Sequence, residues 1–141
     1  MTIAQWILAP IFLHVVLILV VAIFGLRARI AAVMSGKTTL KAIALDNSAW
    51  PEEARKLGNN LNNQFEFPTL WYAVCGLLLV TGKADWVGVV LSWLYLILRI
   101  FHSVVHTGSN HVPLRMRLFL ASVAVVMAMW MWFAIRFYVI G

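Results

Sequence analysis

The stretch Asn63-Gln64-Phe65-Glu66-Phe67-Pro68 places a polar cluster directly before the apolar run of residues 69–80. A carboxylate one turn inside a membrane span costs roughly 2.5–3.5 kcal/mol on insertion scales, so Glu66 is the first functional candidate. On a continuous helix, Asn59, Asn63 and Glu66 fall at i, i+4 and i+7 and share one face. We therefore expect this face to meet polar partners from later parts of the chain.

The composition indicates an integral membrane protein. Of the 141 residues, 63% are hydrophobic and only 11% are charged, and the mean hydropathy is +0.91. A chain with so few polar residues cannot cover a soluble domain. Hydrophobic stretches recur, each long enough to cross about 30 Å of hydrocarbon as a helix. We predict an all-α integral membrane fold, a four-transmembrane-helix bundle built as one domain from residues 1–141, with spans near 3–26, 59–81, 86–107 and 115–139 and a cytoplasmic loop at 27–58.

The cations predict how the chain is oriented in the membrane. Nine of the eleven Lys and Arg residues lie in the 27–58 loop or near the connection between the third and fourth spans, and only Lys83 and Arg136 lie opposite. Because positive residues stay on the cytoplasmic side, both termini are expected outside the cytoplasm, as in a multi-pass protein of a bacterial-type inner membrane. The net charge of +6 thus reflects topology, so we expect membrane lipid and no nucleic acid as partner.

Two later stretches supply cations that can face Glu66. On a helical third span, Arg99, His102 and His106 fall at i, i+3 and i+7 and form one stripe, and Arg115 begins the fourth span close by. One acid facing two arginines leaves a positive excess after pairing. That excess suits an anionic ligand, and a cation beside a thiol lowers the pKa of the thiol from about 8.5 towards neutrality.

Three short motifs follow one another along the predicted spans. Asn63-x-x-Glu66 opens the second span, Arg99-x-x-His102 comes late in the third, and Pro113-x-Arg115 opens the fourth. This layout resembles the MAPEG family, the membrane-associated proteins in eicosanoid and glutathione metabolism. The family includes microsomal glutathione transferases, leukotriene C4 synthase and microsomal prostaglandin E synthase. The resemblance covers nearly the whole chain.

The resemblance implies a homotrimer that binds glutathione between neighbouring subunits at the cytoplasmic side. The expected activity is that of a membrane-bound glutathione transferase or peroxidase, in which the glutathione thiolate attacks a lipophilic electrophile or hydroperoxide dissolved in the bilayer. Arg115 would be the catalytic residue that stabilises this thiolate. The glutathione-binding residues would be Arg27, Asn63, Glu66, Arg99, His102 and His106.

The chain departs from the family pattern at four positions. Asn59 and Asn62 stand where glutathione-using relatives carry basic residues, and His106 and Phe119 stand where the prostaglandin and leukotriene synthases carry tyrosines. A site with fewer cations and no phenol binds a dianionic peptide less well, so eicosanoid synthesis is not expected. These departures also keep open a second class of protein, a non-catalytic MAPEG-like membrane subunit or scaffold. In that class, Glu66, Arg99 and Arg115 form a buried ionic network that holds the helices together.

A haem or metal protein is the third class. His102 and His106, four residues apart, could share a metal with His111 nearby, and His14 could pair with another histidine across a haem. No carboxylate or cysteine completes a ligand set, and His14 and His102 lie at different depths in their spans. We therefore expect no metal.

Overall fold

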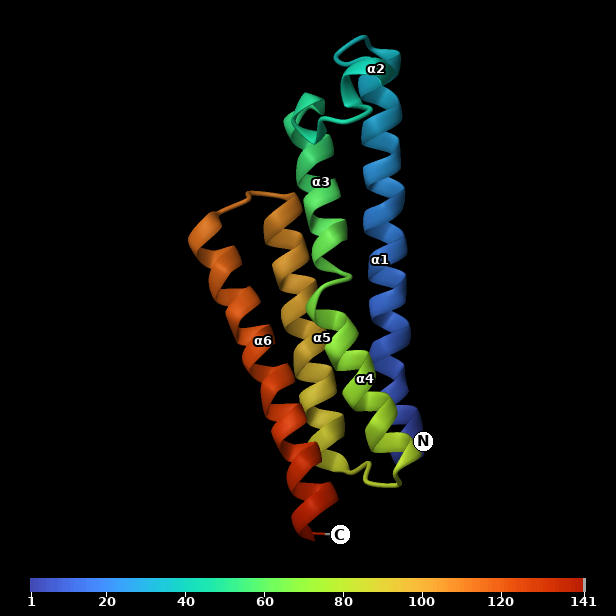
Figure 1. The fold of residues 1–141 in the computed structure, drawn as a ribbon, viewed down its shortest axis with the longest axis vertical. Coiled ribbons are helices and arrows are strands. Elements are labelled where there is room, and N and C mark those ends of the chain that lie inside the picture. The colour runs from blue at the N-terminus through green and yellow to red at the C-terminus, as the bar shows by residue number, and fades with distance from the viewer. Residues whose placement is uncertain (141) are drawn as a thin grey trace.

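The computed structural model describes residues 1–140, and the regular elements in this range are helices (Figure 1). In chain order they are α1 (Ile3–Met34), α2 (Leu40–Ile43), the 3-10 helix η1 (Asn47–Ala49), α3 (Glu52–Asn63), α4 (Phe67–Val80), α5 (Trp86–Thr107), α6 (Val112–Ile135) and the π-helical segment η2 (Arg136–Ile140). Three helical stretches are long and apolar enough to cross a membrane, namely α1, α5 and α6 with its η2 continuation. The protein is therefore an integral membrane protein with an all-helical fold.

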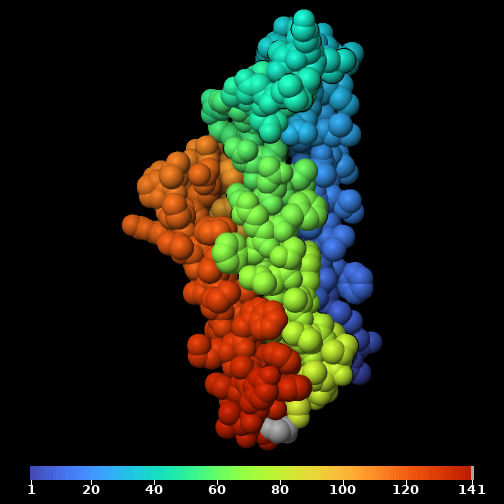
Figure 2. Space-filling model, viewed as in Figure 1, coloured from blue at the N-terminus to red at the C-terminus, as the bar shows by residue number. Residues whose placement is uncertain are grey.

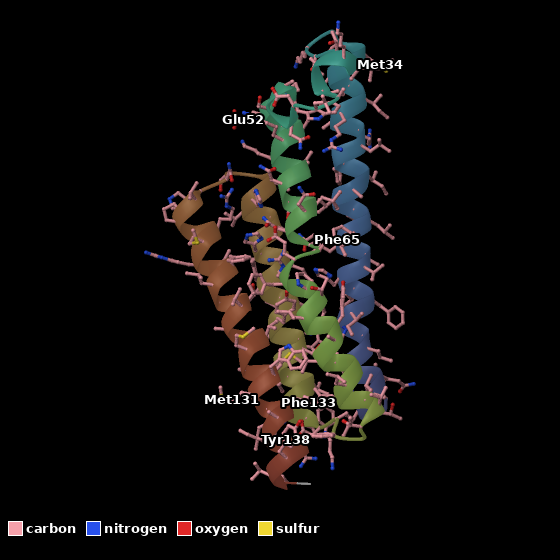
Figure 3. The ribbon with its side chains drawn as sticks, in the orientation of Figure 1. Met34, Glu52, Phe65, Met131, Phe133 and Tyr138 are labelled. Carbon is pink, nitrogen blue, oxygen red and sulfur yellow. The ribbon has the colours of Figure 1, made fainter. Side chains whose placement is uncertain are left out.

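The predicted second span is divided into two helices. α3 ends at Asn63 and α4 begins at Phe67, with residues 64–66 in a turn between them. The two helices lie end to end beside α1 (Figure 1), and Phe65 marks the break (Figure 3). Pro68 explains the break, because it lacks the N–H that would bond the carbonyl of Gln64 and its ring clashes with that carbonyl in a continuous helix.

This break changes two of the sequence predictions. The shared face of Asn59, Asn63 and Glu66 required a continuous helix, so that prediction is wrong. With 12 and 14 residues, α3 and α4 are each too short to cross the bilayer alone. The fourth span therefore stays a prediction that depends on α3 and α4 acting together.

One end of the molecule extends past the connection between α5 and α6. α1 has 32 residues, about 48 Å at 1.5 Å per residue, and runs to Met34, well beyond the expected span end at residue 26. The upper parts of α1 and α3, with α2, stand clear of α6 (Figures 1 and 2). Both termini lie at the opposite end (Figure 1). We refer to residues 26–58 as the projecting end.

Three helices approach one another closely around Gly88 of α5, near the end of the molecule that carries both termini. A Cβ added at Gly88 would lie 3.2 Å from Leu78 Cδ1 of α4 and 3.7 Å from Ile7 Cδ1 of α1, so only a small residue allows this approach. Asp85 caps α5 by accepting a hydrogen bond of 2.9 Å from the Gly88 N–H. The surrounding core consists of Ile7, Trp71, Val74, Cys75, Leu78, Val89, Tyr95, Leu96, Val126 and Met129.

Candidate functional site

A chain of hydrogen-bonded polar side chains crosses the middle of the bundle at the break between α3 and α4. His14 of α1 contacts the Tyr72 hydroxyl of α4 through Nδ1 and Gln64 Oε1 through Nε2, the latter at 3.0 Å. Gln64 Nε2 donates to Asn60 Oδ1 at 2.8 Å, and Asn60 Nδ2 donates to Ser103 Oγ of α5 at 2.6 Å. His14, Asn60 and Gln64 are fully buried. This series of hydrogen bonds therefore joins α1, α3, α4 and α5 at one level.

The direction of each hydrogen bond follows from the two amides. Because Gln64 Nε2 donates to Asn60, the group that faces His14 is the carbonyl oxygen, which only accepts. His14 must then carry its proton on Nε2, and its Nδ1 accepts from the Tyr72 hydroxyl. Both ring nitrogens of His14 are occupied in this arrangement, which argues against the haem interpretation. Within residues 1–140, no three His, Cys, Asp or Glu side chains gather as a metal site.

Arg99 of α5 also donates hydrogen bonds to this group of buried side chains. Its Nη2 donates to the main-chain oxygen of Asn63 at 2.6 Å and to Gln64 Oε1 at 3.1 Å. The last carbonyls of a helix have no intrahelical donor, and a cation there also interacts favourably with the helix dipole. The break that ends α3 at Asn63 thus creates the acceptor that Arg99 uses.

The rest of the Arg99 guanidinium belongs to a row of buried nitrogens on α5. Arg99 is 0% exposed, and within residues 1–140 neither of the two ion pairs includes it. Its Nε and Nη1 have no hydrogen-bond partner, and the same is true of Nδ1 in His102 and in His106. A buried polar group left without a partner costs about 1–3 kcal/mol, so such groups are expected where a ligand or water supplies the missing partner.

The start of α6 closes this region. Phe119 packs against His102, with ring centroids 5.9 Å apart, and against Phe67 at 5.4 Å. Arg115 lies one turn earlier and is half-buried, and its Nη1 donates to Asn110 Oδ1 at 2.6 Å. The Arg115 charge is close enough to act on both His102 and His106. The predicted stripe on α5 and the predicted catalytic arginine therefore do come together.

Glu66 lies at the edge of this region, where its charge acts on Arg99 without forming an ion pair within residues 1–140, whereas Arg27 lies away from it. Glu66 is exposed at the break and forms no ion pair with Arg99 or Arg115 among the described residues, so a buried ionic network of the three is absent there. The physical reason is the break, which turns Glu66 outward and offers Arg99 a carbonyl instead. Arg27 lines a separate cavity of about 570 Å³ between α1 and α3, together with Lys37 and Glu53.

A comparison with protein families matches residues 3–135 to the MAPEG family. The chain belongs to the MAPEG family. The match covers nearly the whole chain and all seven predicted site residues, and it confirms the resemblance seen in the motifs. No curated protein and no solved structure gave a match.

Sequence reasoning missed the residues that carry the buried hydrogen bonds in this MAPEG protein. Helical spacing pointed to Asn63 and Glu66, whereas the buried amides are Asn60 and Gln64. Two signals could have found them: Pro68 predicts the break that turns Glu66 outward, and Asn60 and Gln64 are four residues apart and so share one helix face. The sequence indicates His14 only as a possible haem ligand, because its partners lie 50 and 58 residues away and no local pattern reveals them.

Proposed function

We propose that this MAPEG protein is a membrane-bound glutathione transferase or peroxidase that activates glutathione as a thiolate against lipophilic electrophiles or hydroperoxides. The observation that carries the proposal is the buried Arg99, whose Nε and Nη1 have no hydrogen-bond partner within residues 1–140, and neither do the nearby Nδ1 atoms of His102 and His106. Glutathione offers two carboxylates and two amide carbonyls, which are the acceptors that such nitrogens require.

Each residue has a role that its position supports. Arg99, His102 and His106 would bind carboxylate and backbone groups of the peptide, and the exposed Glu66, with Asn63, would hold its amine end. Arg115 would stabilise the thiolate, because a neighbouring cation lowers the pKa of a thiol. The sulfur then donates its electron pair to the carbon of an electrophile, whose leaving group departs with the electrons of the broken bond. With a hydroperoxide, the sulfur attacks oxygen and breaks the O–O bond, which releases the alcohol and leaves a sulfenic acid that a second glutathione converts to the disulfide and water.

The proposed site draws on neighbouring subunits. Glu66 is exposed and Arg27 lies on a different cavity from the other binding residues, so both are free to complete the site of another copy. This supports a homotrimer with glutathione bound between subunits at the cytoplasmic side. The chain would cross the membrane four times, with α3 and α4 forming one span and both termini outside the cytoplasm.

The test is conjugation of glutathione to a lipophilic electrophile by the purified protein and its Arg115→Ala variant. Loss of one preorganised cation at the reacting atom is expected to lower turnover about 10²-fold or more, while the trimer stays intact by light scattering. Arg117→Ala is the matched control, since Arg117 is an exposed cation on the same helix. The turnover of this variant should equal that of the wild type. Unchanged turnover in Arg115→Ala would overturn the proposal.

A second candidate function is a non-catalytic MAPEG-like subunit or scaffold. It is favoured by the use of Arg99 Nη2 as a structural donor to Asn63 and Gln64, which joins α5 to the end of α3. Under this alternative, the purified protein forms a stable assembly that neither binds glutathione nor responds to it, and the protein co-purifies with another membrane protein. Glutathione-dependent stabilisation of a bare homotrimer would exclude it.

A further inference from the structure

Two cavities meet at the projecting end, and they differ in chemistry. One, of about 230 Å³, has a polar wall made by Arg29, Ser48, Arg55, Asn59 and Asn62, among others. The second, of about 340 Å³, has an almost entirely apolar wall made by Leu26, Ile30, Val33, Met34 and Leu40. Arg29 and Trp50 line both cavities. We call these the polar chamber and the apolar chamber; both are open at the surface, Met34 of the apolar chamber is 83% exposed, and the two share one boundary.

The shared boundary is held in place by close contacts. The Arg29 guanidinium carbon lies 5.2 Å from the centroid of the Trp50 ring, within the range of a cation–π interaction. On the other side, a Cβ added at Gly58 of α3 would lie 3.0 Å from Arg29 Nη2. The guanidinium therefore sits between an aromatic ring and Gly58, and a larger residue at position 58 would require it to shift by a few tenths of an ångström.

The cations of the polar chamber are only weakly neutralised by acids, because the Glu52 charge acts on Arg55 but forms its ion pair with Lys56. Within residues 1–140, neither Arg29 nor Arg55 takes part in an ion pair. Asp46 is bonded instead to Ser48, accepting from its N–H at 2.7 Å and from its hydroxyl at 2.8 Å. Hydrogen bonds from the Ser48 side chain and backbone hold the pKa of Asp46 below its usual value. The guanidinium groups of Arg29 and Arg55 and three side-chain amides therefore line the polar chamber, and none of the described residues that line it is a carboxylate.

We propose that the two chambers form a binding site for a small amphiphilic anion, with its carboxylate between Arg29 and Arg55 and its alkyl chain in the apolar chamber. Arginine matches a carboxylate through its planar fork of donors, and the apolar wall removes the chain from water. The apolar wall continues along α1 after Arg29, away from the predicted span. A bilayer lipid with its headgroup at Arg29 would send its chains in the opposite direction, so a free carboxylate fits better. The site shares no residue with the proposed glutathione site.

The test uses octanoate as probe and the full chain in nanodiscs of phosphatidylcholine, with calorimetry corrected by empty nanodiscs. We expect saturable binding of octanoate, and affinity about tenfold lower or worse in Arg29→Gln and in Arg55→Gln. Arg117→Gln removes an exposed cation on α6, far from Arg29 in the sequence, and this variant should bind octanoate as the wild type does. Gly58→Ala keeps every charge but crowds Arg29, so it should also weaken binding while circular dichroism shows a folded protein.

Three results would overturn the assignment. The first is equal octanoate affinity in wild type, Arg29→Gln and Arg55→Gln. The second is acetate binding as tight as octanoate binding, because the apolar chamber would then contribute nothing. The third is loss of octanoate binding in nanodiscs that contain phosphatidylglycerol, because a lipid headgroup would then be the occupant.

Discussion

Replacing Gln64 by leucine should destabilise the protein by roughly 3 kcal/mol. Gln64 is 0% exposed and makes three hydrogen bonds: it accepts from His14 Nε2 at 3.0 Å and Arg99 Nη2 at 3.1 Å, and it donates to Asn60 at 2.8 Å. Leucine has similar bulk but removes all three bonds. At about 1 kcal/mol for each neutral bond and somewhat more for the charged one, the total is about 3 kcal/mol, or nearer 2 kcal/mol on the lower values typical of membrane interiors.

The assay is unfolding in mixed detergent micelles by increasing SDS, followed by circular dichroism. Asn62→Leu is the matched control, since Asn62 is an exposed amide two residues away and its replacement should change the free energy of unfolding by less than about 0.5 kcal/mol. A loss in Gln64→Leu no larger than that of the control would refute the reasoning. It would mean that the buried hydrogen bonds do not hold the break in place.

Further predictions concern the end of the molecule that carries both termini, and they use the same unfolding assay. Asp85→Ala should cost about 1–2 kcal/mol because it removes the cap of α5 and the acceptor of the Trp132 Nε1–H at 3.0 Å; no change would show that neither bond matters. Arg136→Gln should cost less than about 1 kcal/mol, since its ion pair with Asp85, at 3.4 Å, is partly exposed, and a larger loss would contradict this. Gly88→Val should cost about 1–3 kcal/mol, because its Cβ would lie 3.2 Å from Leu78, and wild-type stability would show that the helices can separate freely.

The membrane character could be predicted from the sequence because it depends on hydrophobicity averaged over long segments. The family could be predicted because it depends on the order of short motifs along the chain. Continuous apolar runs identify α1, α5 and α6 whatever their neighbours are. The stripe of Arg99, His102 and His106 was also predicted correctly, because α5 is an unbroken helix and regular spacing places them on one face. Helical spacing thus predicts which side chains share a face wherever the helix is regular.

The second span shows where such rules fail. Pro68 is compatible both with the start of a helix and with a break inside a span, and the apolar residues after it fit either case. The partner of Arg99 is the main-chain carbonyl of Asn63, which no pattern of side chains reveals. The interior position of Gln64 depends on the break and on His14 together, so it follows only from the three-dimensional arrangement.

The central claim is that the region around Arg99 and Arg115 binds glutathione and stabilises its thiolate. The most direct measurement is glutathione binding to the purified protein in detergent by calorimetry, with the ultraviolet absorbance of the thiolate recorded for wild type and Arg115→Ala. The account predicts saturable binding with a thiolate signal that Arg115→Ala abolishes and Arg117→Ala retains. Absence of binding at millimolar glutathione, or a thiolate signal unchanged in Arg115→Ala, would contradict it.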